Sequence, residues 1–348
     1  GTVDIAFSFK ADDSLAGKTT VVFETLQYEG KDLAVHADLE DLPQHIYFPR
    51  IGTEAVNPAA GDHIMAAGEE AEIRDTVSYE KLLPGTEYTL KGVLIVGSTG
   101  EPLTVNGEEV RAEKTFIAES PEGEEELVFN FDASGLSGNE LVVFEELYLD
   151  TSLVAQHKDP EDEGQTVYIP DGHTTAADPD TEEHTMMAGG KVLIRDRVFY
   201  ENLVPGAEYA VRGRVMLKPL GDEEALELEA AMVDENGKEE EERIFTPKEK
   251  DGSVDVYFEV DSEELRGRSV VVFETVEYIV REPESRVLLF AHEDIADEEQ
   301  TIHFPDGETT ALDSDTGGHT ANADEDVKII DEVRYINLIP GKTYIVNG

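Results

Sequence analysis

One spacing of chemically useful side chains recurs three times along this sequence of 348 residues. In the stretch "AQHKDPEDEGQTVYIP" a histidine stands eight residues before a glutamine, and two related stretches keep the same register. The three pairs are His36 and Gln44, His157 and Gln165, and His292 and Gln300. A histidine can act as a general base, and a glutamine amide can be attacked by an activated nucleophile. The repeated register therefore indicates either a reaction or a fixed polar contact at one place in the fold.

A glutamate inside an apolar stretch precedes each of these pairs. The stretches are "VVFETL", "VVFEEL" and "VVFETV", which contain Glu24, Glu145 and Glu274. A carboxyl buried beside such apolar residues has a raised pKa, so it could stay protonated and donate to the amide or to the departing nitrogen. Hydrogen bonds from backbone amides would instead lower the pKa of the same carboxyl, and this alternative stays open.

These residues belong to a repeat that covers the chain. The glutamines are 121 and 135 residues apart, from 165 − 44 and 300 − 165. A second signature, "IRDTVSYEKLLPGTEY" and its two relatives, keeps the same steps through Asp75, Asp196 and Asp331. Two complete repeats and two partial ones follow from this periodicity. We expect the end of one repeat, two whole repeats and the start of another at residues 1–50, 51–172, 173–308 and 309–348.

The local pattern within each repeat predicts β-sandwiches. Apolar and polar residues alternate in short runs such as "EELVFNFD" and "QTVYIP", and Gly, Pro, Asp and Asn bound these runs. Repeats of this length with many short strands are typical of immunoglobulin-like domains. We therefore expect an all-β protein, built as an elongated array of tandem sandwiches.

The composition excludes several classes of function. With 27 basic and 79 acidic residues the net charge is −52, which disfavours nucleic acid and anionic lipid as partners. The absence of cysteine excludes disulfides and thiolate metal sites. No apolar run is long enough to span a membrane. Motifs of hydrolases, phosphate-binding loops and zinc proteases are also absent, so we do not expect an enzyme that acts on an external substrate.

The segments between repeats are acidic and regular. "HTTAADPDTEEHTMMAGG" and "ETTALDSDTGGHTANADE" contain Asp178 and Asp180, and Asp313 and Asp315. Carboxylates at this spacing are weak candidates for calcium ligands, but the glycine and the closing glutamate of an EF-hand loop are missing. We interpret these segments, and the related "GTEAVNPAAGDHIMAAGE", as solvated connectors. Calcium is the one cofactor considered.

A specific family resemblance accounts for the recurring residues. The combination of "DTVSYEKL", "VVFEEL", "AQHKD" and "DEGQTVYIP" in one repeat resembles the Thr–Gln ester-bond domains, or VaFE-type repeats, of Gram-positive surface adhesins. The resemblance implies a CnaB-like, immunoglobulin-like domain in which a first-strand threonine attacks a last-strand glutamine and releases ammonia. It implies Thr76 as the nucleophile, Gln165 as the amide, and Glu145 and His157 as the assisting groups.

The other repeats depart from this pattern at the position of Thr76. Arg197 and Glu332 stand there, and neither can form the ester. We therefore expect a cross-link in the first complete repeat only, and an ion pair between Arg197 and Glu274 in the second. The first strand of the leading segment lies outside the sequence. The remaining recurring residues are then relics of the site: Glu24, His36, Gln44, Glu274, His292 and Gln300.

The resemblance implies an extracellular protein on the cell wall or cell surface. We expect this chain to be a stalk or fibre segment of an adhesin, strengthened by self-cross-linking. Its partners would be neighbouring repeats of the same long protein and a host or cell-surface ligand. The alternative is a calcium-bridged or ligand-binding filament module without cross-links.

Overall fold

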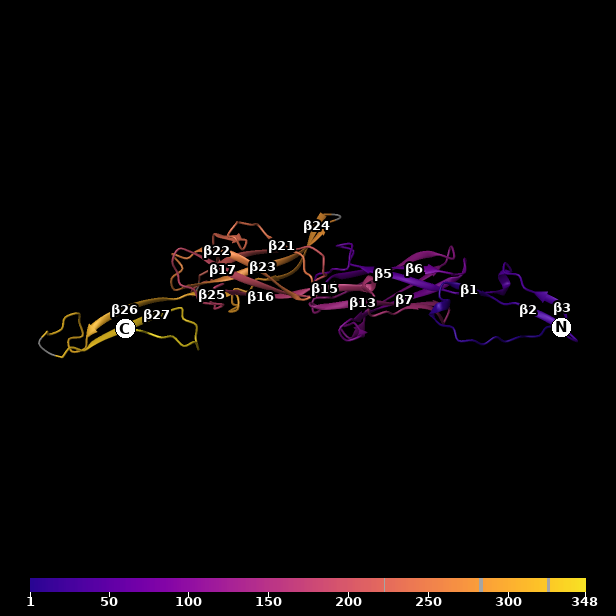
Figure 1. Cartoon of the computed structure of the whole chain (residues 1–348), viewed down its shortest axis with the longest axis horizontal. Coiled ribbons are helices and arrows are strands. Elements are labelled where there is room, and N and C mark those ends of the chain that lie inside the picture. Colours follow the sequence, from indigo (N-terminus) through magenta and orange to yellow (C-terminus); the bar gives the residue numbers. More distant parts are fainter. Residues whose placement is uncertain (222, 282–283, 324–325) are drawn as a thin grey trace. The chain divides into compact units, whose positions relative to one another are not determined.

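The computed structural model describes residues 1–221, 223–281, 284–323 and 326–348 (Figure 1). Apart from three short 3-10 helices, the regular elements of these residues are β-strands, most of them antiparallel to their neighbours. The predicted all-β class is confirmed. The chain divides into two compact units, Gly1–Ile169 and Pro170–Gly348. Among the described residues, no helix has the length and apolar character needed to cross a membrane.

Two sheets form the complete sandwich of the first unit. One sheet has the order β12 (Gly123–Phe131), β6 (Ala71–Glu80), β5 (Arg50–Val56). The other has the order β11 (Arg111–Ile117), β7 (Glu87–Val96), β13 (Asn139–Leu149), β14 (Ser152–His157), with β15 (Thr166–Ile169) on β13 and β8 (Glu101–Pro102) on β7. The helix η3 (Glu163–Gln165) leads into β15, and β9 (Thr104–Val105) pairs with β10 (Glu108–Glu109).

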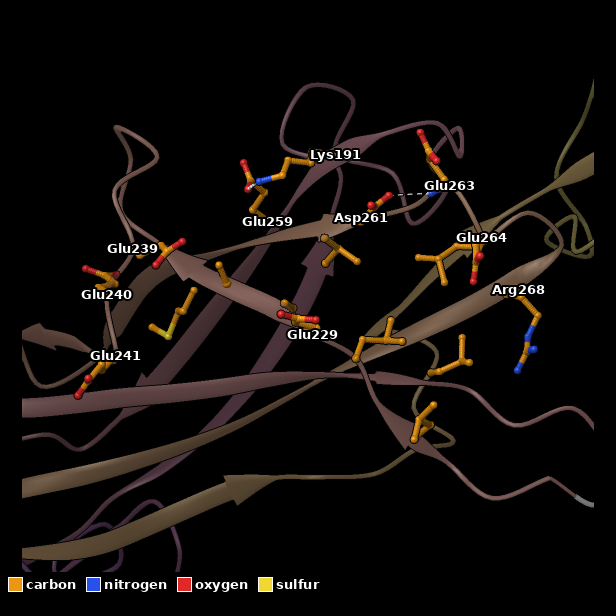
Figure 2. A pocket seen from close by; sticks show the side chains of 18 residues that line it. Lys191, Glu229, Glu239, Glu240, Glu241, Glu259, Asp261, Glu263, Glu264 and Arg268 are labelled. Atoms are coloured by element: carbon orange, nitrogen blue, oxygen red, sulfur yellow. Dashed lines mark hydrogen bonds and ion pairs between the residues drawn. The ribbon is translucent and has the colours of Figure 1, made fainter.

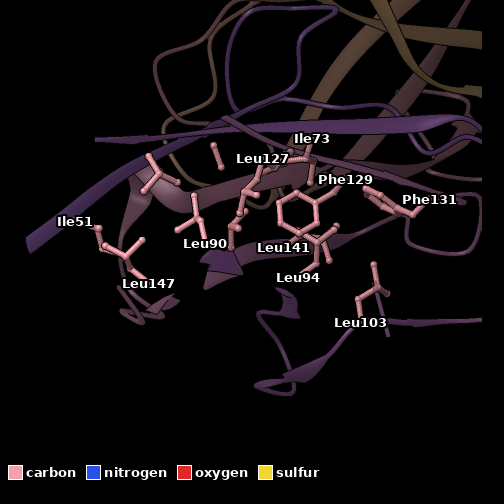
Figure 3. Packing of buried hydrophobic residues seen from close by; sticks show 14 of the residues in the cluster. Ile51, Ile73, Leu90, Leu94, Leu103, Leu127, Phe129, Phe131, Leu141 and Leu147 are labelled. Atoms are coloured by element: carbon pink, nitrogen blue, oxygen red, sulfur yellow. The ribbon is translucent and has the colours of Figure 1, made fainter. Parts of the chain in front are cut away.

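The core lies between these two sheets. Alternate residues of β6 from Ala71 to Tyr79 are buried, so one face of this strand meets the core. Figure 3 shows Ile73 and Phe129 from one sheet packed with Leu94 from the other. A side chain at Gly92 of β7 would place its Cβ 2.6 Å from Cζ of Phe129, so glycine is required for this close packing.

The second unit contains a sandwich of the same plan with added length. One sheet has the order β16 (Asp171–Ala177), β17 (Lys191–Glu201), β22 (Gly252–Asp261), β20 (Ala230–Val233). The other has the order β19 (Leu226–Glu227), β18 (Tyr209–Leu217), β23 (Arg268–Arg281), β24 (Glu284–His292), with β21 (Arg243–Phe245) on β18 and β25 (Thr301–Phe304) on β23. The first sheet therefore gains β20 as a fourth strand.

The two ends of the chain carry partial folds. In the leading segment β1 (Lys18–Val21) pairs with β4 (His45–Phe48), and β2 (Glu24–Tyr28) pairs with β3 (Lys31–His36). The helices η1 (Asp13–Leu15) and η2 (Leu42–Gln44) precede β1 and β4. In the trailing segment β26 (Asp306–Asp313) pairs with β27 (Ile329–Ile336). Many large apolar side chains of both segments are exposed.

The prediction that the regular acidic segments are solvated connectors was wrong for their first residues. These residues form β5, β16 and β26, the first strands of three repeats. Their few apolar residues and the nearby Gly, Pro and Asp concealed the strand pattern. The predicted repeat boundary at 172/173 therefore falls inside β16, which begins at Asp171.

Candidate cross-linking sites

A buried threonine forms the centre of a polar cluster in the second sandwich. Thr174 of β16 donates a hydrogen bond through Oγ1 to Oε2 of Glu274 at 3.1 Å. Nδ1 of His292 is 3.2 Å from the same hydroxyl, and the side-chain amide of Gln300 contacts it directly. A nucleophile, a base, an acid and an amide therefore meet at one oxygen atom.

The histidine is held by an aspartate outside this cluster. Nε2 of His292 is 2.6 Å from Oδ2 of Asp297, which leaves Nδ1 directed at Thr174. His157 has the same partner in Asp162, at 2.8 Å. A carboxylate that orients an imidazole in this way also stabilises the imidazolium that forms when the base takes a proton. Sequence reasoning missed these aspartates, although each stands five residues after its histidine.

A second buried carboxyl lies beside the glutamate. The amide of Gln300 donates through Nε2 to Oδ1 of Asp196 at 3.3 Å. Burial raises the pKa of Asp196 to about 6, and burial together with the charge of Asp196 raises the pKa of Glu274 well above its ordinary range. Two adjacent buried carboxyls cannot both ionise at low cost. Glu274 therefore keeps a proton at neutral pH and can donate it.

The first sandwich holds the same set of residues. Thr53 of β5 stands opposite Val77, as Thr174 stands opposite Val198 in the second sandwich. The strand β5 contacts both η3, which ends in Gln165, and β14, which ends in His157.

The acid pair of the first sandwich is Asp75 and Glu145. Burial, then the charge of Asp75, raises the pKa of Glu145 to about 11. The carboxyl of Glu145 also interacts with the Thr53 hydroxyl, and burial raises the pKa of Asp75 to about 6. Glu145 is therefore protonated at neutral pH, the state in which it can act as an acid.

These buried polar atoms are poorly satisfied for a folded protein. The hydroxyl of Thr53, both amide atoms of Gln165, and both carboxyl groups of Asp75 and Glu145 lack a hydrogen bond of good geometry. An unsatisfied buried polar group costs about 1–3 kcal/mol, so such a cluster opposes folding and points to chemistry.

A family model described as "T-Q ester bond containing domain" matches residues 1–48, 49–169, 171–304 and 307–348. The chain belongs to this family. The family predicted from the sequence is therefore confirmed. The matches cover nearly the whole chain, and each complete sandwich corresponds to one T-Q domain.

Solved structures with some similarity to the chain were also found. One is a bacterial adhesin from Mobiluncus mulieris containing intramolecular disulfide, isopeptide and ester bond cross-links, with 15% identity and a TM-score of 0.33 over 83% of this chain and 98% of that chain. Another is the C-terminal domain of the AgI/II polypeptide BspA of Streptococcus agalactiae, with 9% identity and a TM-score of 0.29 over 70% and 98%. No curated protein matches the chain.

The assignment of Thr76 as the nucleophile of the first T-Q domain was wrong. Thr76 lies on the exposed face of β6, whereas its neighbour Asp75 points into the site. Side chains alternate across a strand, so both residues cannot face the core. The threonine at the site is Thr53, and its repeats Thr174 and Thr309 keep the steps of 121 and 135 residues.

The second T-Q domain was inferred to lack a nucleophile because Arg197 stands at the position of Thr76. That inference is also wrong, because the position of Thr76 is not at the site. Arg197 forms an ion pair with Asp255 at 2.7 Å and not with Glu274, and Glu332 pairs with Arg334 at 2.8 Å. Glu274, His292 and Gln300 surround Thr174, so the second T-Q domain contains a hydroxyl at this site.

The two partial segments each hold a different part of the site. Glu24 and His36 face each other across β2 and β3, as Glu145 and His157 do in the first T-Q domain, and Gln44 ends η2. Thr309 and Asp331 lie on β26 and β27.

The candidate calcium ligands do not form a metal centre. Oδ1 of Asp178 accepts from the backbone of Asp180, and Oδ1 of Asp313 accepts from the backbone of Thr316. Asp180 and Asp315 lie within turns, and Asp178 and Asp313 stand directly before them. The described part of the chain contains no group of three or more side chains that could hold a metal ion.

A cavity of about 1200 Å³ in the second T-Q domain lies away from the cross-linking residues. Leu217, Met232 and Leu265 line it, and Figure 2 shows carboxylates such as Glu229 and Glu264 around it. None of the cross-linking residues lines this cavity.

The raised pKa of Glu145 predicts a pH dependence in a chain that cannot close the first link. In Thr53→Ala the folded state keeps a proton on Glu145 between its ordinary pKa and about 11, and the unfolded state loses it. The stability of the first T-Q domain should therefore fall as the pH rises from 7 to 10, by at most about 1.4 kcal/mol per pH unit. Hydrogen exchange at β6 and β13 measures this stability. Adding Glu145→Gln should remove the slope, and an unchanged slope would show that another group causes it.

Proposed function

We propose that this chain is a structural segment of an extracellular adhesin stalk or fibre, whose complete T-Q domains each close an intramolecular ester. The links join Thr53 to Gln165 and Thr174 to Gln300. The observation that carries this proposal is the direct contact between the Thr174 hydroxyl and the Gln300 amide, beside His292 and Glu274.

The reaction follows from the arrangement of these groups. His292 takes the proton of the Thr174 hydroxyl, and Oγ1 of Thr174 attacks Cδ of Gln300. Protonated Glu274 supplies a proton to the nitrogen as the carbon–nitrogen bond breaks, ammonia leaves, and the proton held by His292 replaces the one that Glu274 gave. A hydroxyl and an amide thus become an ester and ammonia, with no oxidant and no external substrate.

Burial favours both the formation and the survival of this ester. Thr174, Glu274 and Gln300 are almost inaccessible to solvent. The fold holds the hydroxyl against the amide, which replaces a slow bimolecular encounter by a positioned reaction. Exclusion of water also limits hydrolysis of the product.

The topology explains the mechanical value of such a link. Thr53 is on the first strand of one sheet, and Gln165 directly precedes the last strand of the other. The ester would close a loop of 165 − 53 = 112 residues, worth about 5 kcal/mol in the chain-entropy model. Force applied across the domain would meet a covalent bond before the sheets separate. In a surface protein without cysteine, the ester would constrain the fold as a disulfide does in other proteins.

The mass of the intact chain tests the proposal. The wild-type chain should be lighter than its sequence by two molecules of ammonia, and Thr53→Ala and Thr174→Ala should each regain one. Thr76→Ala is the matched control and should still lack both, because Thr76 faces solvent. A folded wild-type chain of unshifted mass would refute the ester links.

Removal of the acid or the base should slow the second link. Glu274→Gln takes away the proton donor and His292→Ala the base, so each should lower the cross-linking rate by about 10²–10⁴-fold. A time course of intact mass after cell-free synthesis measures the rate. Glu259→Gln changes a carboxylate that pairs with Lys191 away from the site and serves as the control. Equal rates in all of these chains would mean that the fold alone drives the reaction.

A further inference from the structure

The segment that covers one side of the core differs between the two complete T-Q domains. In the first domain, Leu103 donates its backbone N–H to Leu94 at 2.8 Å, and Leu94 donates to Val110 at 3.1 Å. This closed loop leaves Leu103 only 4% exposed. In the second domain, Leu228 makes the equivalent bond, at 2.8 Å, to Val215, which stands 121 residues after Leu94. The chain then continues into β20, so it passes here from one sheet to the other.

The cavity of about 1200 Å³ lies where the chain crosses between the sheets. Leu217 and Leu228 line it from the side of β18, and Met232 and Val260 line it from the strands β20 and β22. Leu226, which also lines it, is 61% exposed. An apolar cavity with an exposed leucine beside it is suited to the apolar groups of a ligand. Its volume exceeds the about 300–1,000 Å³ of ordinary small-molecule pockets, so it has room for several side chains of a polypeptide.

The surroundings of this cavity are strongly acidic. Eight carboxylates and two cationic side chains line it, and Figure 2 shows carboxylates such as those of Glu241 and Glu264 around the apolar residues. Both cations, Lys191 and Arg268, already pair with carboxylates. The cavity therefore keeps an excess of negative charge, and a ligand with positive groups complements it.

The strand β20 adds a sheet edge to this surface. It is the outer strand of its sheet. Glu240 donates its backbone N–H to the carbonyl of Met232 at 3.0 Å, so a short return segment covers the end of the strand. Ala230 and Ala231, at its start, both line the cavity. Small side chains at a sheet edge let an extended segment approach the backbone, as in recognition by strand addition.

We propose that this cavity binds an extended basic segment of a partner polypeptide, in which aliphatic side chains alternate with lysine or arginine. The aliphatic side chains fill the apolar floor, the cationic groups pair with the surrounding carboxylates, and the backbone runs along Ala230 and Ala231. A second copy of this chain carries the same net charge of −52, which disfavours it as the occupant. The binding does not depend on the ester links, because none of the cross-linking residues lines the cavity.

Peptide binding to the full-length chain tests the proposal. The probe is a short fluorescein-labelled peptide of alternating lysine and leucine, and fluorescence anisotropy measures its Kd. Serine in place of leucine keeps the charge of the probe and should weaken binding at least about tenfold, because the apolar floor then stays unfilled. Leu226→Ser should weaken binding of the lysine–leucine probe about threefold or more, and this exposed side chain can be changed without opening the core.

Charge-reversed variants separate the cavity from the general acidity of the chain. Glu241→Lys together with Glu264→Lys should weaken binding of the lysine–leucine probe at least about tenfold. Glu101→Lys together with Glu124→Lys is the matched control, because it changes the net charge equally at exposed positions of the first T-Q domain. This control should bind the probe nearly as wild type does. Equal losses in both pairs, or equal binding of the leucine and serine probes, would overturn the proposal.

Two further readouts separate this proposal from the ester links and from self-association. Thr174→Ala should regain one ammonia in mass and still bind the probe as wild type does, so failure of the ester links would leave this binding unchanged. Sedimentation of the wild-type chain alone should show a monomer. Self-association that Leu226→Ser abolishes would identify a second copy as the occupant and overturn the proposal. Absence of saturable binding of the lysine–leucine probe would overturn it as well.

Discussion

The burial of two carboxyl groups side by side is the constraint on which each complete T-Q domain depends. Asp196 and Glu274 lie in the core of the second domain, where burial raises the pKa of both groups. One of them must keep a proton, and this protonated carboxyl is the acid that the proposed reaction needs. Such a pair costs stability in an unreacted domain. The sandwich tolerates it because two well-packed sheets surround the site, and the proposed ester would then constrain the chain whose folding brought the pair together.

The order of folding and chemistry follows from the topology. The threonine comes from the first strand, the acid from a central strand of the opposite sheet, and the glutamine from the turn before the last strand. These groups meet only after both sheets have formed and packed. The proposed link could therefore not close in an unfolded chain, and a closed link would report a native domain. By the same dependence, a segment that holds only part of the site could not close a link by itself.

Much of this organisation was readable from the sequence, because the repeat places Glu145, His157 and Gln165 in a fixed register, and strand alternation predicted the sandwiches. The nucleophile was not found. In β6 the apolar residues Ile73, Val77 and Tyr79 share a face with Asp75, so strand alternation already directs Asp75 inward and Thr76 outward, against the role that the resemblance gave to Thr76. The structure turns Asp75 into the core, and the hydroxyl comes from β5, a strand with few apolar residues. The signal that would have identified Thr53 was its recurrence as Thr174 and Thr309 at the steps of the glutamines.

Fragment-ion sequencing of a proteolytic digest of the wild-type chain tests the central claim most directly. The account predicts a branched peptide in which the side chain of Thr174 is joined to the side chain of Gln300, with one ammonia missing at the junction. Recovery of Thr174 and Gln300 only in separate, unmodified linear peptides from folded protein would contradict it.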